Sequence, residues 1–96
     1  MKIFSDIEVL QKIPLFLPEW HYDRENISRE YLFSSYMSSI EFVNEIAKLA
    51  ESIDHHPLIH IFWRKVVVQI HTHSVKSVTS LDFELATNMD KVFNSF

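Results

Sequence analysis

The sequence contains neither cysteine nor glycine, and each absence removes a class of function. Without cysteine there can be no disulfide framework, thiolate zinc site, iron–sulfur cluster or cysteine nucleophile. Without glycine, the Rossmann fingerprint, the P-loop and the G-x-S-x-G nucleophile elbow are missing, because each relies on the backbone freedom of glycine. The chemistry left to this chain is that of nitrogen and oxygen side chains.

Long apolar runs and excess positive charge are also missing. No run approaches the roughly 18 apolar residues that cross a bilayer, and Asp6 and Glu8 interrupt the region where a signal peptide carries its apolar segment. Nine basic against 13 acidic residues give a net charge of −4, so the chain lacks the positive charge that drives binding to phosphate backbones. We expect a soluble, cytoplasmic protein that binds neither membranes nor nucleic acid.

The 96 residues are 47% hydrophobic, which is enough for one core and one domain over residues 1–96. Apolar residues recur at helical spacing in three segments, each behind a start signal. The first helix is predicted over residues 6–12, before Pro14, and the second ends at about residue 54 or 55, because Pro57 disfavours helix before it. The predicted capping boxes are Ser5 with Glu8, Ser38 with Glu41 and, as a near variant, Thr79 with Asp82.

Four segments rich in β-branched and aromatic residues predict strands: residues 20–23, 27–33, 60–63 and 65–72. In the last of these, alternation should turn Val66, Val68, Ile70 and Thr72 toward the helices, and Val67, Gln69, His71 and His73 away from them. The order α-β-β-α-β-β-α predicts an α+β fold, with a four-stranded antiparallel sheet and three helices on one face.

The chain has six histidines, and five of them lie within nineteen positions: His55, His56, His60, His71 and His73. They admit three interpretations. They can be ordinary surface or hydrogen-bonded residues. They can ligate a metal, since His71 and His73 share a strand face, although adjacent histidines chelate poorly and H-E-x-x-H is absent. They can also perform acid–base catalysis without a cofactor, because imidazole has an ordinary pKa near 6.5, and this third interpretation uses the cluster best.

The same region resembles a known signature. The run Glu51-Ser-Ile-Asp54-His55-His56-Pro57, then Trp63, Thr72-His73 and Asp82, is similar to that of the pterin-4a-carbinolamine dehydratases. Upstream aromatic residues match that family's spacing, so the resemblance covers about residues 20–92. It implies the fold order predicted above and the dehydration of 4a-hydroxytetrahydropterin to quinonoid dihydropterin, with no metal or other cofactor.

By position, the resemblance implies three active-site histidines, His55, His56 and His73, with His55 and His73 as the proton-transferring pair and His56 orienting the pterin. It implies supporting pocket positions at Glu51, Asp54, Pro57, Asp82 and Trp20. Three of these have simpler explanations as well: Glu51 as a solvated helix carboxylate, Asp82 as a capping residue, and Trp20 as a core aromatic.

The resemblance also implies partners: a pterin substrate, a homodimer or homotetramer, and an aromatic amino acid hydroxylase in the same pathway. The alternatives are a non-catalytic dimerisation or interaction module of the same fold and a histidine metal-binding protein. The sequence departs from the family pattern at Leu58 and Ile59, and in the loop over residues 74–78, which must turn without the glycine common there.

Overall fold

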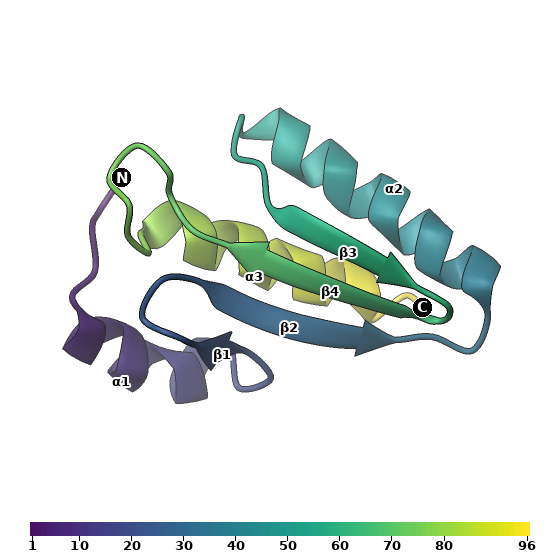
Figure 1. The fold of residues 1–96 in the computed structure, drawn as a ribbon, viewed down its shortest axis with the longest axis horizontal. Coiled ribbons are helices and arrows are strands. Elements are labelled where there is room, and N and C mark those ends of the chain that lie inside the picture. The colour runs from purple at the N-terminus through teal and green to yellow at the C-terminus, as the bar shows by residue number, and fades with distance from the viewer.

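A computed structural model describes all 96 residues and has the predicted order of helices and strands. The sheet runs in the order β1-β2-β4-β3, and every neighbouring pair is antiparallel. The helices cover one face of it, with α3 lying behind the sheet in Figure 1, so the predicted α+β fold is confirmed. The elements are α1 (Asp6–Phe16), β1 (His21–Tyr22), β2 (Ile27–Leu32), α2 (Tyr36–Ser52), β3 (Leu58–Phe62), β4 (Lys65–Ile70) and α3 (Ser80–Phe93).

The two faces of the sheet differ as the alternation in β4 predicts. Val66, Val68 and Ile70 are fully buried against the helices, and Thr72 is buried beyond them. The intervening side chains are more accessible, and His73 is exposed. One face of the sheet therefore carries the core, while the other is open and available for a site.

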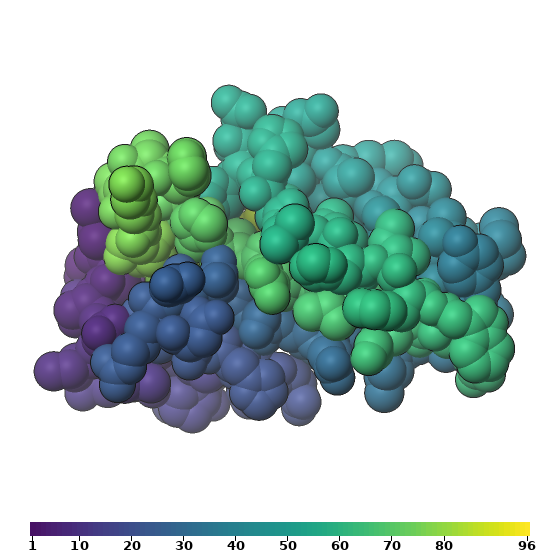
Figure 2. All heavy atoms as spheres, in the orientation of Figure 1, coloured from purple at the N-terminus to yellow at the C-terminus, as the bar shows by residue number.

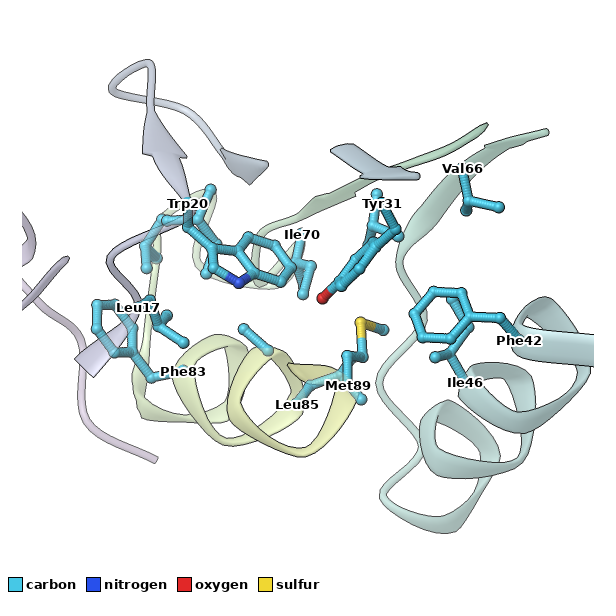
Figure 3. Close-up of a cluster of buried hydrophobic side chains, with 14 of the residues drawn as sticks. Leu17, Trp20, Tyr31, Phe42, Ile46, Val66, Ile70, Phe83, Leu85 and Met89 are labelled. Carbon is cyan, nitrogen blue, oxygen red and sulfur yellow. The ribbon is translucent and has the colours of Figure 1, made fainter. Parts of the chain in front are cut away.

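The core lies between the sheet and the helices (Figure 3). Tyr31 of β2 packs on Phe42 of α2 with ring centroids 4.6 Å apart, and Met89 of α3 is fully buried beside them. Trp20 is also part of this core, only 2% exposed, and meets Tyr31 edge to face at 6.3 Å. Aromatic contacts of this kind add about 0.5–1.5 kcal/mol each beyond the area they bury.

The carboxylate of Asp90 accepts hydrogen bonds from several polar side-chain atoms at the edge of this core. It accepts hydrogen bonds from the Trp20 indole at 3.1 Å, the Tyr31 hydroxyl at 2.6 Å and the Arg29 guanidinium at 2.8 Å. Burial, and then the hydrogen bond to Asp90, raise the pKa of Tyr31 far above its ordinary value. The polar tips of large aromatic side chains are thereby satisfied in the interior.

Helix ends differ from the sequence-based expectation at three places. α1 continues through Pro14 to Phe16. Proline removes only one amide donor, and beyond it the Leu17 amide donates to the Ile13 carbonyl at 2.8 Å, so the helix is not ended there. The predicted Ser38–Glu41 capping box is wrong, since Ser35 is the N-cap of α2 and accepts from the Ser38 amide at 3.1 Å. α2 also ends at Ser52 rather than at residue 54 or 55. The capping boxes of α1 and α3 are confirmed.

Tight turns are made without glycine by four residues with left-handed backbone, Arg24, Asp54, Arg64 and Lys76, at φ between 50° and 76°. Lys76 lies in the loop after β4, so this loop turns by a strained non-glycine residue. Asp54 follows α2 and redirects the chain toward β3. None of the helices combines the length and the apolar character that a membrane crossing requires.

Candidate functional site

A hollow of about 320 Å³ lies on the open face of the sheet, at the end where β4 stops and β2 and β3 start. Its volume is at the small end of the roughly 300–1,000 Å³ typical of small-molecule sites. In Figure 2, atoms that follow α2, atoms from the end of β4 and atoms that precede β2 surround a depression in this face. We call it the histidine hollow; it is lined by Asn26, His56, Pro57, Leu58, Gln69, His71 and His73.

His73 begins the loop that follows β4, and the backbone around it is fixed. The Thr72 amide donates to the Ser77 carbonyl at 2.9 Å, and the Lys76 amide donates to the His73 carbonyl at 3.2 Å. The His73 side chain is exposed and makes no hydrogen bond within the chain. Both of its ring nitrogens are therefore free to exchange a proton with a ligand.

His56 reaches the hollow from the segment between α2 and β3. Its Nε2 lies 3.0 Å from the carboxylate of Glu51, in the last turn of α2, and its Nδ1 lies 4.0 Å from Asp54 Oδ1. Pro57 follows it in the wall of the hollow. Glu51 and Asp54 are highly exposed, so they contact His56 from the solvent side.

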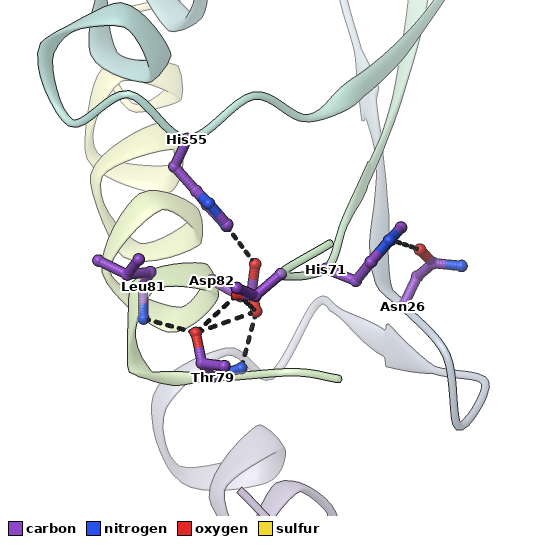
Figure 4. A network of polar contacts seen from close by, with 7 residues as sticks. Asn26, His55, His71, Thr79, Leu81 and Asp82 are labelled. Carbon is purple, nitrogen blue, oxygen red and sulfur yellow. Dashed lines mark hydrogen bonds and ion pairs between the residues drawn. The ribbon is translucent and has the colours of Figure 1, made fainter. Parts of the chain in front are cut away.

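His55 points the other way, into the protein (Figure 4). Its Nε2 lies 2.5 Å from Asp82 Oδ1, His55 is 8% exposed, and Asp82 is fully buried. The other oxygen, Asp82 Oδ2, accepts from the Thr72 hydroxyl at 2.9 Å and from the Thr79 amide at 2.7 Å. The capping box of α3 thus also holds His55, and neither His55 nor Asp82 lines the hollow.

The structure separates the sequence-predicted site residues into three groups. His56, Pro57 and His73 line the hollow, with Glu51 and Asp54 beside His56. His55 and Asp82 form a buried pair. Trp20 is a core residue whose indole N–H donates a hydrogen bond to Asp90, and it does not line the hollow.

The site implied by the resemblance leaves out several lining residues, among them His71, which the sequence suggested only as a member of the histidine cluster and as a possible metal ligand. Gln69 lies on the open face of β4, and His71 and His73 continue the same alternation beyond the end of the strand, so the predicted alternation already carried a signal for Gln69 and His71. His71 Nδ1 lies 2.8 Å from Asn26 Oδ1. The sequence did not indicate that Asn26 belongs to the site. Asn26 is brought to the hollow by the pairing of β2 with β4, in which the next residue, Ile27, is the register partner of Ile70.

Two other observations bear on the choice of site. No group of three or more His, Asp or Glu side chains is arranged to hold a metal ion. A larger hollow of about 490 Å³ lies beside β1 and β2 on the same face, lined by Glu19, His21, Ser28, Arg29, Glu30 and Val67. It contains a single imidazole, whereas the histidine hollow has three, His56 from the segment after α2 and His71 and His73 from the segment after β4.

Comparison with known proteins identifies the family. The family model described as pterin 4 alpha carbinolamine dehydratase matches residues 3–92 of this chain. The chain belongs to the pterin 4 alpha carbinolamine dehydratase family. The family match includes all the helices and strands except the last residue of α3, and it includes the segments that build the histidine hollow.

Relatives of this dehydratase family member come from bacteria and archaea. A protein of Hahella chejuensis is 37% identical over 90 residues, covering 90% of this chain and 80% of its own length. One of Picosynechococcus is 36% identical over 88 residues, covering 92% of this chain and 95% of its own. One of Sulfolobus acidocaldarius is 36% identical over 73 residues, covering 76% and 80%. All three are provisionally named as pterin-4-alpha-carbinolamine dehydratases.

Solved structures agree with the dehydratase fold. A transcriptional coactivator/pterin dehydratase from Brucella melitensis superposes with a TM-score of 0.87 at 28% identity, covering 94% of this chain and 97% of that one. A pterin dehydratase-like protein described as a RuBisCO assembly factor superposes with a TM-score of 0.65 at 17% identity, covering 77% and 86%. The second likeness bears on the fold alone.

Proposed function

We propose that this protein dehydrates 4a-hydroxytetrahydropterin to quinonoid dihydropterin and water, with histidines as general acid and base. The observation that carries the proposal is that His56 and His73, from separate segments of a dehydratase-family chain, line one hollow. Pro57 and three imidazole rings line the hollow, and side chains of this kind can pack against a flat bicyclic ring. The substrate is the species left when a hydroxylase uses a tetrahydropterin, and we propose an aromatic amino acid hydroxylase as its source.

The reaction needs two proton transfers. One group protonates the departing 4a-hydroxyl, which leaves as water when the C4a–O bond breaks. A second group removes the proton from N5, and the electrons of the N5–H bond form the new C4a=N5 double bond. The acid loses one proton and the base gains one, so water returns both groups to their starting states. General acid–base assistance of each event is typically worth about 10²–10⁴-fold.

We propose His73 and His56 as the proton-transferring pair. His73 has both ring nitrogens free of the chain, and His56 is paired with the Glu51 carboxylate at 3.0 Å, which can stabilise an imidazolium formed there. His55 was expected from the sequence to transfer a proton. Because its Nε2 is engaged by buried Asp82, we propose instead that His55 positions the segment that carries His56.

The test is stopped-flow measurement of 4a-hydroxytetrahydropterin dehydration by the wild-type protein and single variants. The expected result is a rate well above the spontaneous one, with kcat reduced at least about 100-fold in His73→Ala and in His56→Ala. The reduction of kcat in His55→Ala should be smaller. The matched control is His60→Ala, which removes an exposed imidazole of the same sheet face outside the hollow.

Two results would contradict the proposal. A wild-type rate equal to the buffer rate would favour a non-catalytic module of this fold. Normal turnover in both His56→Ala and His73→Ala would move the chemistry out of the histidine hollow.

We also propose that the chain self-associates. β1 and β3 are the edges of the sheet, and unpaired strand edges favour pairing with another chain. β3 in addition exposes Leu58, Ile61 and Phe62. Light scattering in solution should give a mass of two or four chains, and a mass of one chain would refute this.

A further inference from the structure

We propose that His71 is a further pterin-binding residue of the histidine hollow, and that Asn26 positions its ring so that Nε2 is presented as a hydrogen-bond acceptor. The inference rests on the proposed function, because it assigns the same ligand to the same hollow. Neither residue belongs to the signature that pointed to this family, which supplies His55, His56 and His73.

His71 occupies a central place on the open face. It stands between Gln69 and His73 in the alternation of β4 and the loop after it, and all three side chains line the hollow. The ring centroids of His71 and His73 are 6.0 Å apart. A ligand that reaches His73 therefore lies beside the His71 ring as well.

The contact with Asn26 fixes the protonation pattern of the His71 ring. Asn26 Oδ1 lies 2.8 Å from His71 Nδ1. A carbonyl oxygen only accepts, so Nδ1 carries the hydrogen and donates it. His71 Nε2 makes no hydrogen bond within the chain, so in the neutral ring its lone pair is left for a ligand.

Asn26 is itself held in place by the turn before β2. The Asp23 carboxylate accepts from the backbone amides of Asn26 at 2.6 Å and Glu25 at 2.9 Å. The amide of Asn26, the larger cause, and that of Glu25 lower the pKa of Asp23. The Asp23 amide donates back to the Asn26 carbonyl at 3.2 Å. The residue that orients His71 thus sits in a turn with its own hydrogen-bond network.

An acceptor at this position complements one edge of a pterin. The pyrimidine ring of a pterin presents N–H donors, on the ring nitrogen and on the exocyclic amino group, at the end opposite the reduced ring. His56 and His73 are proposed to work on C4a and N5. Binding of the donor edge by His71 would add affinity equally in the ground and the transition state, while His56 and His73 reach the reacting atoms at the other end of the ring.

The first experiment is a double-mutant cycle read by calorimetric titration with 7,8-dihydropterin at about pH 8, where an ordinary imidazole is neutral. His71→Phe keeps a flat ring and removes both nitrogens, and we expect it to raise Kd roughly five- to tenfold, as for the loss of one neutral hydrogen bond. Asn26→Ala should also raise Kd. The double variant should match His71→Phe alone, because Asn26 acts through His71. His60→Ala, outside the hollow, should leave Kd unchanged.

Two further readouts separate positioning from a structural role. Nitrogen NMR of the free protein should show the Nδ1–H tautomer of His71, and Asn26→Ala should shift it toward the Nε2–H tautomer. In the dehydration assay, His71→Phe should raise KM and leave kcat within about twofold of wild type, as expected for the loss of a contact made equally in ground and transition states.

The outcomes distinguish this inference from the proposed function. If the wild-type protein turns over the substrate and the Kd of the His71→Phe variant equals that of the wild type, the role of His71 is overturned and the proposed dehydratase activity still holds. Weakened binding in His71→Phe with no wild-type turnover supports His71 and overturns the dehydratase. Additive losses in the cycle, or an Nε2–H tautomer in the wild type, overturn the role of Asn26. Failure of the wild type to bind 7,8-dihydropterin overturns both proposals.

Discussion

Asp82 connects the stability of the fold to the geometry of the site. One of its oxygens closes the capping box of α3 and accepts from Thr72, while the other holds His55 at 2.5 Å. Its interpretation as a capping residue was therefore right but incomplete. The sequence offered no way to learn of the second role, since the contact between His55 and Asp82 joins residues 27 positions apart.

Replacing Asp82 with asparagine tests the value of this carboxylate. The amide keeps the shape but loses the charge and one acceptor, which leaves buried donors without their partner. We expect the free energy of unfolding to fall by about 2 kcal/mol, measured by urea denaturation. Glu84→Gln removes an exposed charge from the same helix and is the control; equal midpoints for the two variants would show that the buried network adds no stability.

Tyr22 makes the stability of the protein depend on pH in the alkaline range. Its hydroxyl donates to the Asp6 carboxylate, and burial followed by this hydrogen bond raises its pKa from 10.0 to about 12. The folded state thus holds the phenol proton more tightly than the unfolded state. The stability linked to Tyr22 is present below pH 10 and is lost as the pH rises toward 12.

Tyr22→Phe should therefore flatten the decline of unfolding free energy across this window, as measured by urea denaturation at a series of pH values. Tyr36→Phe, at an exposed tyrosine, is the matched control and should leave the slope as in the wild type. An unchanged slope in Tyr22→Phe would show that the contact with Asp6 does not shift the titration.

At the scale of the elements, local signals located every helix and strand but not all of their ends. Period-2 alternation gave the buried face of β4, and two of three capping boxes were right. The start of α2 was misassigned because Ser38 is followed three residues later by Glu41 and so matches the capping box, whereas Ser35 is followed at that spacing by Ser38 and does not. Only the extended backbone of Ser35, at φ −148°, shows which one begins the helix.

The corrected start of α2 predicts a difference between two serines. Ser35→Ala removes the acceptor of the Ser38 amide and should lower the free energy of unfolding by about 1 kcal/mol. Ser38→Ala, inside the first turn, should not lower the free energy of unfolding, because alanine has a higher helix propensity than serine by a few tenths of a kcal/mol. Thermal or urea unfolding of both variants compares them directly, and a larger loss in Ser38→Ala would restore the cap predicted from sequence.

At the scale of the whole molecule, the site depends on long-range pairing that sequence patterns do not encode. The resemblance pointed to His56, Pro57 and His73, which do line the hollow. It did not reveal that His55 faces inward or that Asn26 and His71 meet, whereas the interpretation of Trp20 as a core aromatic was right. The contact of Asn26 with His71 follows from the register of β2 on β4, and the inward direction of His55 comes directly after the left-handed turn at Asp54.

A crystal structure of the protein with 7,8-dihydropterin bound is the most direct test of the histidine hollow as the pterin site. We predict that the bicyclic ring lies in this hollow, within hydrogen-bonding distance of His56 and His73 and with its amino edge toward His71. A ring bound in the larger hollow beside β1, or one with no imidazole within reach, would contradict the assignment.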